Sequence, residues 1–169
     1  MSDEKPQKRI PTAYEKACWL LGMRDYTAKG MLKKLCEKYP HDEAEKAVIR
    51  CVRLGAIDDK RYGEILCRRY AEKYGKKRIV SQLIAKGIGT DLAKELVASY
   101  YEESDEDESA AKIYKILCDY LHRKPLAENT REKAFAYMMR KGYGYREISE
   151  AFNTFKENNP ESFPEQDYI

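Results

Sequence analysis

Two stretches of this chain align with each other without gaps, and this internal repeat limits the folds that the chain can adopt. Residues 83–97 read LIAKGIGTDLAKELV and residues 138–152 read MMRKGYGYREISEAF, and both contain the pattern Lys-Gly-x-Gly. Residues 35–49, LCEKYPHDEAEKAVI, occupy the same place one unit earlier, although Tyr39 and Pro40 stand there in place of the glycine turn. The spacing predicts a protein built from tandem repeats.

Each repeat is predicted to be helical. Apolar residues recur at helical spacing almost everywhere between residues 13 and 155, and alternating β-branched runs are nearly absent. Gly87 and Gly142 are suited to the left-handed residue that ends a helix. Thr90 is predicted to cap the helix that begins after Gly87, and Asp42 the helix that begins after His41. The sequence therefore predicts an all-α fold.

Extending the repeat outward divides the chain into three tandem three-helix units. Each unit is too short to bury an apolar face alone, so neighbouring units are expected to stack and share a core. We expect an elongated, curved solenoid of right-handed type. The predicted segments are a flexible tail at residues 1–12, repeats at residues 13–57, 58–101 and 109–155, an acidic linker at residues 102–108, and a second tail at residues 156–169.

Composition excludes several classes of protein. A mean hydropathy of -0.78 with 36% charged residues leaves little apolar material for a thick globule. No run of about 18 apolar residues exists and the first residues lack an apolar signal core, so we expect a cytoplasmic protein without membrane contact. The five cysteines form an odd set without a Cys-x-x-Cys pair, which argues against a disulfide framework or a zinc site, and we expect no cofactor. They are Cys18, Cys36, Cys51, Cys67 and Cys118.

The middle repeat carries an excess of positive charge. Residues 58–87 hold nine bases against four acids, which leaves a local charge of +5. Residues 76–78, Lys-Lys-Arg, stand where a helix is predicted to begin, although the helix dipole disfavours cations there. Exposed amides beside three cations suit an anion such as DNA phosphate or a partner's carboxylate, and the alternative is a solvated basic turn. The candidate partner-binding or DNA-binding residues are Arg61, Arg68, Arg69, Lys73, Lys76, Lys77, Arg78 and Lys86.

The acidic pair before this basic helix has a structural interpretation. Asp58 is placed to cap the helix while Ile57 packs on Tyr62, so Asp58 and Asp59 are interpreted as structural rather than catalytic. The side chains predicted to face inward along the helix are Tyr62, Ile65, Leu66, Tyr70 and Tyr74.

Three short motifs together resemble the RecX family. They are Arg24-Asp25-Tyr26-Thr27, then Gly55-x-Ile57-Asp58-Asp59 followed by Tyr62, and Arg78-Ile79 leading to Lys86-Gly87-Ile88. The resemblance covers about residues 13 to 155 and is densest in the middle repeat. It implies that the matching positions hold the fold. These positions are Asp58, Asp59, Tyr62, Ile79, Gly87 and Ile88.

Two positions depart from the family pattern. Gly30 stands where the family usually has a glutamate that completes a capping box with Thr27, so the helix that follows Thr27 is expected to begin less firmly. Tyr39-Pro40 replaces a glycine turn, which leaves the path of that connection open.

The resemblance also implies a function. It implies a crescent of three-helix modules that lies in the groove of the RecA recombinase filament and modulates, mostly by inhibition, its DNA-dependent ATPase, filament growth and recombination activity. DNA repair and the SOS response are the implied setting, the implied partners are RecA and the phosphates of single-stranded and double-stranded DNA, and we expect a monomer.

Three alternatives to this function remain. One is a nonspecific DNA-binding helical repeat protein, in which Tyr143 and Tyr145 are the candidates for stacking on bases. Another is an enzyme, which the isolated His41 and His122 disfavour because neither has a plausible nucleophile or ligand set at useful spacing. The last is a generic helical scaffold for another protein.

Overall fold

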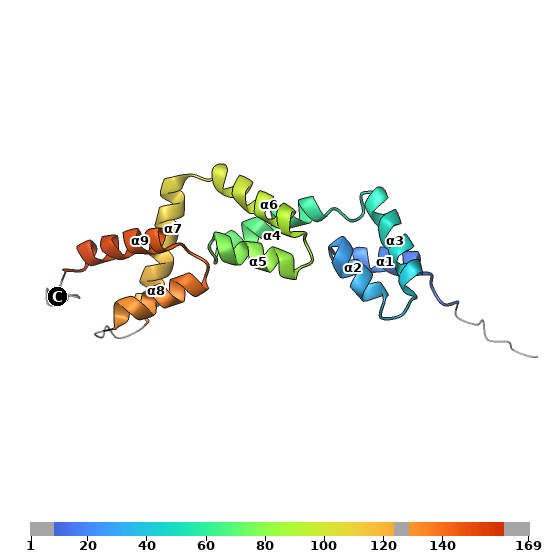
Figure 1. The fold of residues 1–169 in the computed structure, drawn as a ribbon, viewed down its shortest axis with the longest axis horizontal. Coiled ribbons are helices and arrows are strands. Elements are labelled where there is room, and N and C mark those ends of the chain that lie inside the picture. Colours follow the sequence, from blue (N-terminus) through green and yellow to red (C-terminus); the bar gives the residue numbers. More distant parts are fainter. Residues whose placement is uncertain (1–8, 124–128, 161–169) are drawn as a thin grey trace, which may run out of the picture. The chain divides into compact units, whose positions relative to one another are not determined.

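The computed structural model describes residues 9–123 and 129–160, and the elements in these ranges are all α-helices (Figure 1). The predicted all-α fold is confirmed. The helices are α1 (Ala13–Leu21), α2 (Ala28–Leu35), α3 (His41–Arg53), α4 (Asp59–Ala71), α5 (Lys76–Ala85), α6 (Thr90–Glu102), α7 (Glu106–Leu121), α8 (Thr130–Arg140) and α9 (Tyr145–Asn158).

The described residues form two compact units, and their boundary falls inside α4. Unit 1 contains residues 9–62 together with the turn Lys86–Ile88. Unit 2 contains Gly63–Ala85 and the described residues from 89 onward.

The core of unit 1 lies where α1 and α2 pack against α3. Ala17 and Ala44 are fully buried, and such small side chains allow close helix packing. Met31 and Leu35 of α2 fill the remaining space without exposed surface. The beginning of α1 is held by a capping box, in which the Thr12 hydroxyl accepts from the Glu15 amide.

The core of unit 2 lies mainly where α8 and α9 pack against α7. Leu117, Met138 and Ile148 are fully buried at the centre of this cluster, and Phe152 packs edge-on against Phe135. Elsewhere in unit 2, α5 packs on α6.

Two predicted helix caps are wrong by one or two residues. The residue before α3 is Pro40 and the residue before α6 is Gly89, and both have extended backbone torsions. Proline fixes φ at a value that suits this position, and α3 begins at His41. A cap at Asp42 would have placed the beginning of α3 two residues later. Asp42 therefore lies within the first turn of α3, and Thr90 is the first residue of α6.

The predicted inward stripe of α4 is wrong at Ile65, whose exposed fraction is 42%. Small side chains at positions four residues apart, Gly63, Cys67 and Ala71, are buried instead, together with Leu66. They make the buried face narrow, and the Cys67 thiol approaches the Leu96 carbonyl oxygen at 4.0 Å. The remaining predicted residues, Tyr62, Tyr70 and Tyr74, are half-buried at the edges of this face.

The acidic segment is shorter than the predicted linker. Helix α6 ends at Glu102 and α7 begins at Glu106, so only residues 103–105 separate the two helices. Asp105 caps α7 by accepting from the Asp107 amide at 2.8 Å. At the predicted tails, Thr12 caps α1 and α9 continues to Asn158, whereas residues 1–8 and 161–169 lie outside the described residues.

Candidate partner-binding surface

The Lys-Gly turn at residues 86–87 lies against the beginning of α2 in unit 1. The Thr27 hydroxyl donates to the Lys86 carbonyl oxygen at 2.8 Å and accepts from the Gly30 amide at 3.0 Å. Thr27 is only 1% exposed. Gly87 has a φ of +98°, and a Cβ atom there would lie 2.7 Å from the Thr27 hydroxyl oxygen. The turn therefore requires glycine for both its backbone torsion and its close packing.

The second Lys-Gly turn makes an equivalent junction in unit 2, where it lies against the beginning of α5. The Gly75 amide donates to the Lys141 carbonyl oxygen at 2.9 Å. Gly142 has a φ of +94°, and a Cβ atom there would lie 2.5 Å from the backbone nitrogen of Arg78. The repeat thus reuses one packing arrangement, in which a Lys-Gly turn covers the beginning of a preceding middle helix.

This junction changes the interpretation of residues 76–78. They form the first turn of α5, as the sequence predicts, and that turn contains no acidic residue. The Gly75 amide at this end donates to the Lys141 carbonyl oxygen, and the Gly142 backbone lies close to Gly75 and Arg78. The side chains of Lys76, Lys77 and Arg78 stay exposed and remain the predicted anion-binding groups of this surface.

The eight predicted basic residues are all exposed, and among the described residues none of them forms an ion pair. Six belong to unit 2, on the second half of α4, the turn that follows it and the first turn of α5: Arg68, Arg69, Lys73, Lys76, Lys77 and Arg78. Arg61 and Lys86 belong to unit 1. We call the six residues of unit 2 the basic face.

Lys76 differs from the other members of the basic face in its surroundings. Its Nζ lies 4.7 Å from the centroid of the Tyr101 ring, a cation–π distance. Lys77 and Arg78 are exposed on the same turn.

Lys141 is a further cation beside the basic face that the sequence analysis did not single out. Its Nζ donates to the Lys73 carbonyl oxygen at 3.2 Å and lies 5.3 Å from the centroid of the Tyr137 ring. Lys141 occupies the same repeat position as Lys86, so the alignment of the two Lys-Gly turns contained the signal that would have identified it.

The paired acids hold two helix beginnings. Asp58 Oδ1 accepts from the Arg61 amide at 2.9 Å, and Asp59 Oδ1 accepts from the Ala28 amide at 2.8 Å. The Asp59 carboxylate thus reaches the beginning of α2 from a distant part of the sequence, whereas Gly30 supplies no carboxylate there, and the less firm beginning of α2 stays a prediction. Of the other family positions, Ile79 and Ile88 are buried.

The two candidate stacking tyrosines have different surroundings. Tyr143 is 5% exposed and belongs to the core of unit 2, so it is not available to stack on a nucleic-acid base. Tyr145 is 63% exposed at the beginning of α9.

The other candidate reactive groups are two histidines and a buried cysteine. His41 is the first residue of α3 and His122 caps the end of α7, and both are exposed. In the described ranges, no group of three or more histidine, cysteine, aspartate or glutamate side chains could hold a metal ion. Burial raises the pKa of Cys67 to about 11, so its thiol is protonated at neutral pH. No described helix is both long enough and apolar enough to span a bilayer.

Fold and surface together define a helical repeat protein with exposed basic residues. The family model described as RecX, first three-helix domain, matches residues 13–51. Regulatory protein RecX of Herbaspirillum seropedicae is 27% identical over 139 residues, which cover 79% of this chain and 84% of that protein. The Pelodictyon phaeoclathratiforme protein of the same name is 28% identical over 144 residues, 83% of this chain and 87% of that protein. Over most of its length the chain is therefore similar to proteins named regulatory protein RecX.

A solved structure shares the fold of this chain. The crystal structure of RecX from Lactobacillus salivarius matches with a TM-score of 0.74 at 21% sequence identity. The match covers 86% of this chain and 95% of that chain.

Proposed function

We propose that this protein is a regulator that binds the RecA filament and lowers its DNA-dependent ATPase activity, its growth and its recombination activity. The name shared by its relatives, regulatory protein RecX, supports this proposal. In the proposed role the protein is a cytoplasmic monomer that performs no chemistry on DNA and acts by occupying a surface of the filament.

The observation that carries the proposal at the level of residues is the basic face of unit 2. Its six cations are exposed and have no ion-pair partner among the described residues, so their charge is available to an acidic partner. Carboxylates of RecA and phosphates of the bound DNA are the anions that a filament offers. On the first turn of α5, Lys77 and Arg78 are better placed than Lys76 to contact such an anion, because the Lys76 Nζ lies over the Tyr101 ring.

The proposal is tested with a charge-reversed variant that combines Lys76→Glu, Lys77→Glu and Arg78→Glu. The matched control combines Lys94→Glu, Lys115→Glu and Lys133→Glu, which are exposed on three other helices of unit 2 and change the net charge equally. Far-UV circular dichroism first establishes that both variants are folded. Binding is then measured by co-sedimentation with RecA filaments on single-stranded DNA.

We expect the basic-face variant to bind filaments at least tenfold more weakly than the control, because its three glutamates would repel the carboxylates and phosphates of the filament. A folded basic-face variant that binds as tightly as the control would contradict the assignment of this surface.

A nonspecific DNA-binding protein is the second candidate, and the exposed ring of Tyr145 favours it. Such a protein binds naked DNA with an affinity that falls steeply with salt and that does not depend on RecA. Titration of labelled single-stranded DNA at several salt concentrations, with and without RecA, separates the two functions.

A further inference from the structure

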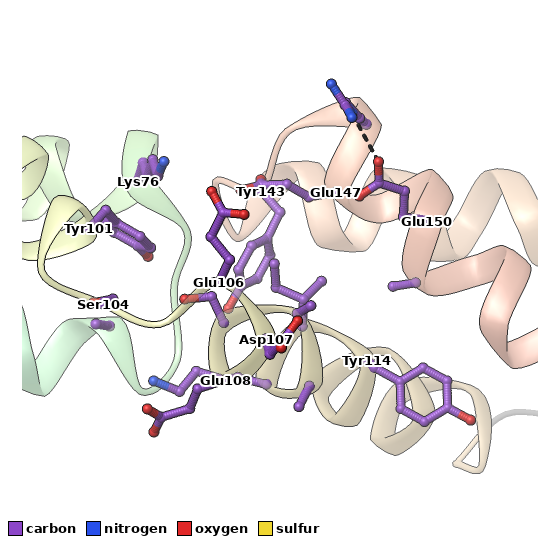
Figure 2. A pocket seen from close by; sticks show the side chains of 18 of the residues that line it. Lys76, Tyr101, Ser104, Glu106, Asp107, Glu108, Tyr114, Tyr143, Glu147 and Glu150 are labelled. Carbon is purple, nitrogen blue, oxygen red and sulfur yellow. Dashed lines mark hydrogen bonds and ion pairs between the residues drawn. The ribbon is translucent and has the colours of Figure 1, made fainter.

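Unit 2 contains a cavity of about 740 Å³ beside the first turn of α7 (Figure 2). Its walls come from the end of α4, the beginning of α5, the end of α6 and the first turns of α7 and α9. Its floor includes the apolar side chains of Ala71, Ile113 and Ala151.

Carboxylates outnumber cations in the lining of this cavity. Glu106, Asp107, Glu108, Glu147 and Glu150 line it, against Lys76, Lys112 and Arg146, so five acids meet three bases and the difference is -2.

Two of those three cations are paired with carboxylates and the third lies over a ring. Arg146 pairs with Glu150 at 2.9 Å, and Lys112 lies 3.9 Å from Glu72. Lys76 lies over the Tyr101 ring. The carboxylates on the first turn of α7 therefore give the cavity a negative potential, which attracts a cation and repels phosphate.

A buried hydroxyl lies within this negative cavity. Tyr143 is 5% exposed, and among the described residues its hydroxyl has no hydrogen-bond partner. Figure 2 shows its side chain reaching from the turn before α9 toward the first turn of α7, where Glu106 and Asp107 lie. Burial raises the pKa of Tyr143 and brings that of Tyr101 to about 12, so both phenols stay neutral. An unpaired buried hydroxyl destabilises the free protein, and a ligand that donates to it removes that cost.

We propose that this cavity binds an arginine side chain from a basic segment of a partner protein, with Tyr143 Oη as an acceptor at its floor and the α7 carboxylates at its rim. The guanidinium group carries five donors in a plane, which suits several acceptors and the faces of tyrosine rings. The apolar floor suits the methylene stem of the side chain.

A metal ion fits the cavity less well than a guanidinium group. A metal ion needs a closer set of ligands than the described residues provide. The proposal goes beyond the function proposed above and does not rest on it, because the acidic cavity would bind basic protein whether or not the basic face binds RecA.

The test measures the anisotropy of a fluorescein-labelled hexa-arginine peptide at physiological ionic strength. The first variant is Tyr143→Phe, which removes one hydroxyl and leaves the charge unchanged. The second is Glu106→Gln, which removes one charge at the rim. Glu45→Gln is its matched control, because Glu45 is exposed on α3 of unit 1 and lies outside the cavity.

Loss of a hydrogen bond to a charged group weakens binding by about tenfold, so we expect that loss for Tyr143→Phe. We also expect Tyr143→Phe to raise the melting temperature of the free protein, because the unpaired hydroxyl is gone. This combination of higher stability and weaker binding is not expected of a residue that only supports the fold. Glu106→Gln should weaken binding several-fold more than Glu45→Gln.

Two results would overturn the proposal. One is a Tyr143→Phe protein that binds the peptide as tightly as the unmodified protein. The other is an equal loss of affinity in Glu106→Gln and Glu45→Gln, because the peptide would then respond only to total charge.

Discussion

Replacement of Gly142 by alanine is expected to destabilise unit 2 strongly, and the structure gives the size of the effect. The φ of +94° costs an L-residue about 1–2 kcal/mol. The new Cβ would lie 2.5 Å from the backbone nitrogen of Arg78, and the shift that relieves such overlap costs on the order of 1–3 kcal/mol. The lower entropy of the unfolded chain returns roughly 0.4–1 kcal/mol. The free energy of unfolding should therefore fall by about 3 kcal/mol.

Two other glycines of unit 2 separate these contributions. Gly75 does not have a positive φ, but its Cβ would lie 2.4 Å from the Gly142 carbonyl oxygen, so Gly75→Ala reports the steric overlap alone. Gly89 has an ordinary backbone and no atom within 4 Å of its would-be Cβ, so Gly89→Ala should change stability by less than about 0.5 kcal/mol.

Urea unfolding followed by far-UV circular dichroism measures the three free energies. Hydrogen exchange of the Gly75 amide, which donates to the Lys141 carbonyl oxygen, reports the junction directly and should become faster in Gly142→Ala. Unfolding of Gly142→Ala and Gly89→Ala at the same urea concentration would contradict the close packing of the Lys141-Gly142 turn against the beginning of α5.

Two further predictions concern buried groups. Thr27→Val should lower the free energy of unfolding by about 2 kcal/mol, because the Lys86 carbonyl and the Gly30 amide both lose their hydrogen-bond partner. Thr27→Ser keeps the hydroxyl and should keep most of the stability. Urea unfolding measures both variants, and an equal loss of stability in the two would contradict this prediction. Iodoacetamide at pH 8 should alkylate the exposed Cys36 well before the buried Cys67. The pKa of Cys67 is raised to about 11, so this residue stays a protonated thiol at pH 8. Mass spectrometry measures the two alkylation rates, and equal rates in the folded protein would refute the prediction.

The helices and turns could be predicted because their signals are local. The spacing of apolar residues indicates each helix, and the glycine of each Lys-Gly pattern indicates the turn that precedes α6 or α9. Gly87 and Gly142 both have the positive φ that the Lys-Gly pattern predicts. The helix beginnings were harder, because Pro40 and Gly89 adopt the extended backbone of a cap without a capping side chain.

Contacts between distant residues could not be predicted from one sequence. Asp59 caps α2 across 31 positions, and no local pattern indicates that pairing. Tyr143 and Tyr145 are two residues apart beside the same glycine, yet one is buried and the other is exposed. Their difference arises from packing against α7, which periodicity does not encode. The cavity was missed for the same reason, because its carboxylates come from separate helices.

The single-stranded-DNA-dependent ATPase rate of a bacterial RecA tests the proposed function most directly. The rate is measured with and without this protein at substoichiometric amounts, and again with excess DNA. The proposal predicts a fall in rate that excess DNA does not restore, because the protein acts on the filament itself. An unchanged rate, or a fall that added DNA abolishes, would contradict it.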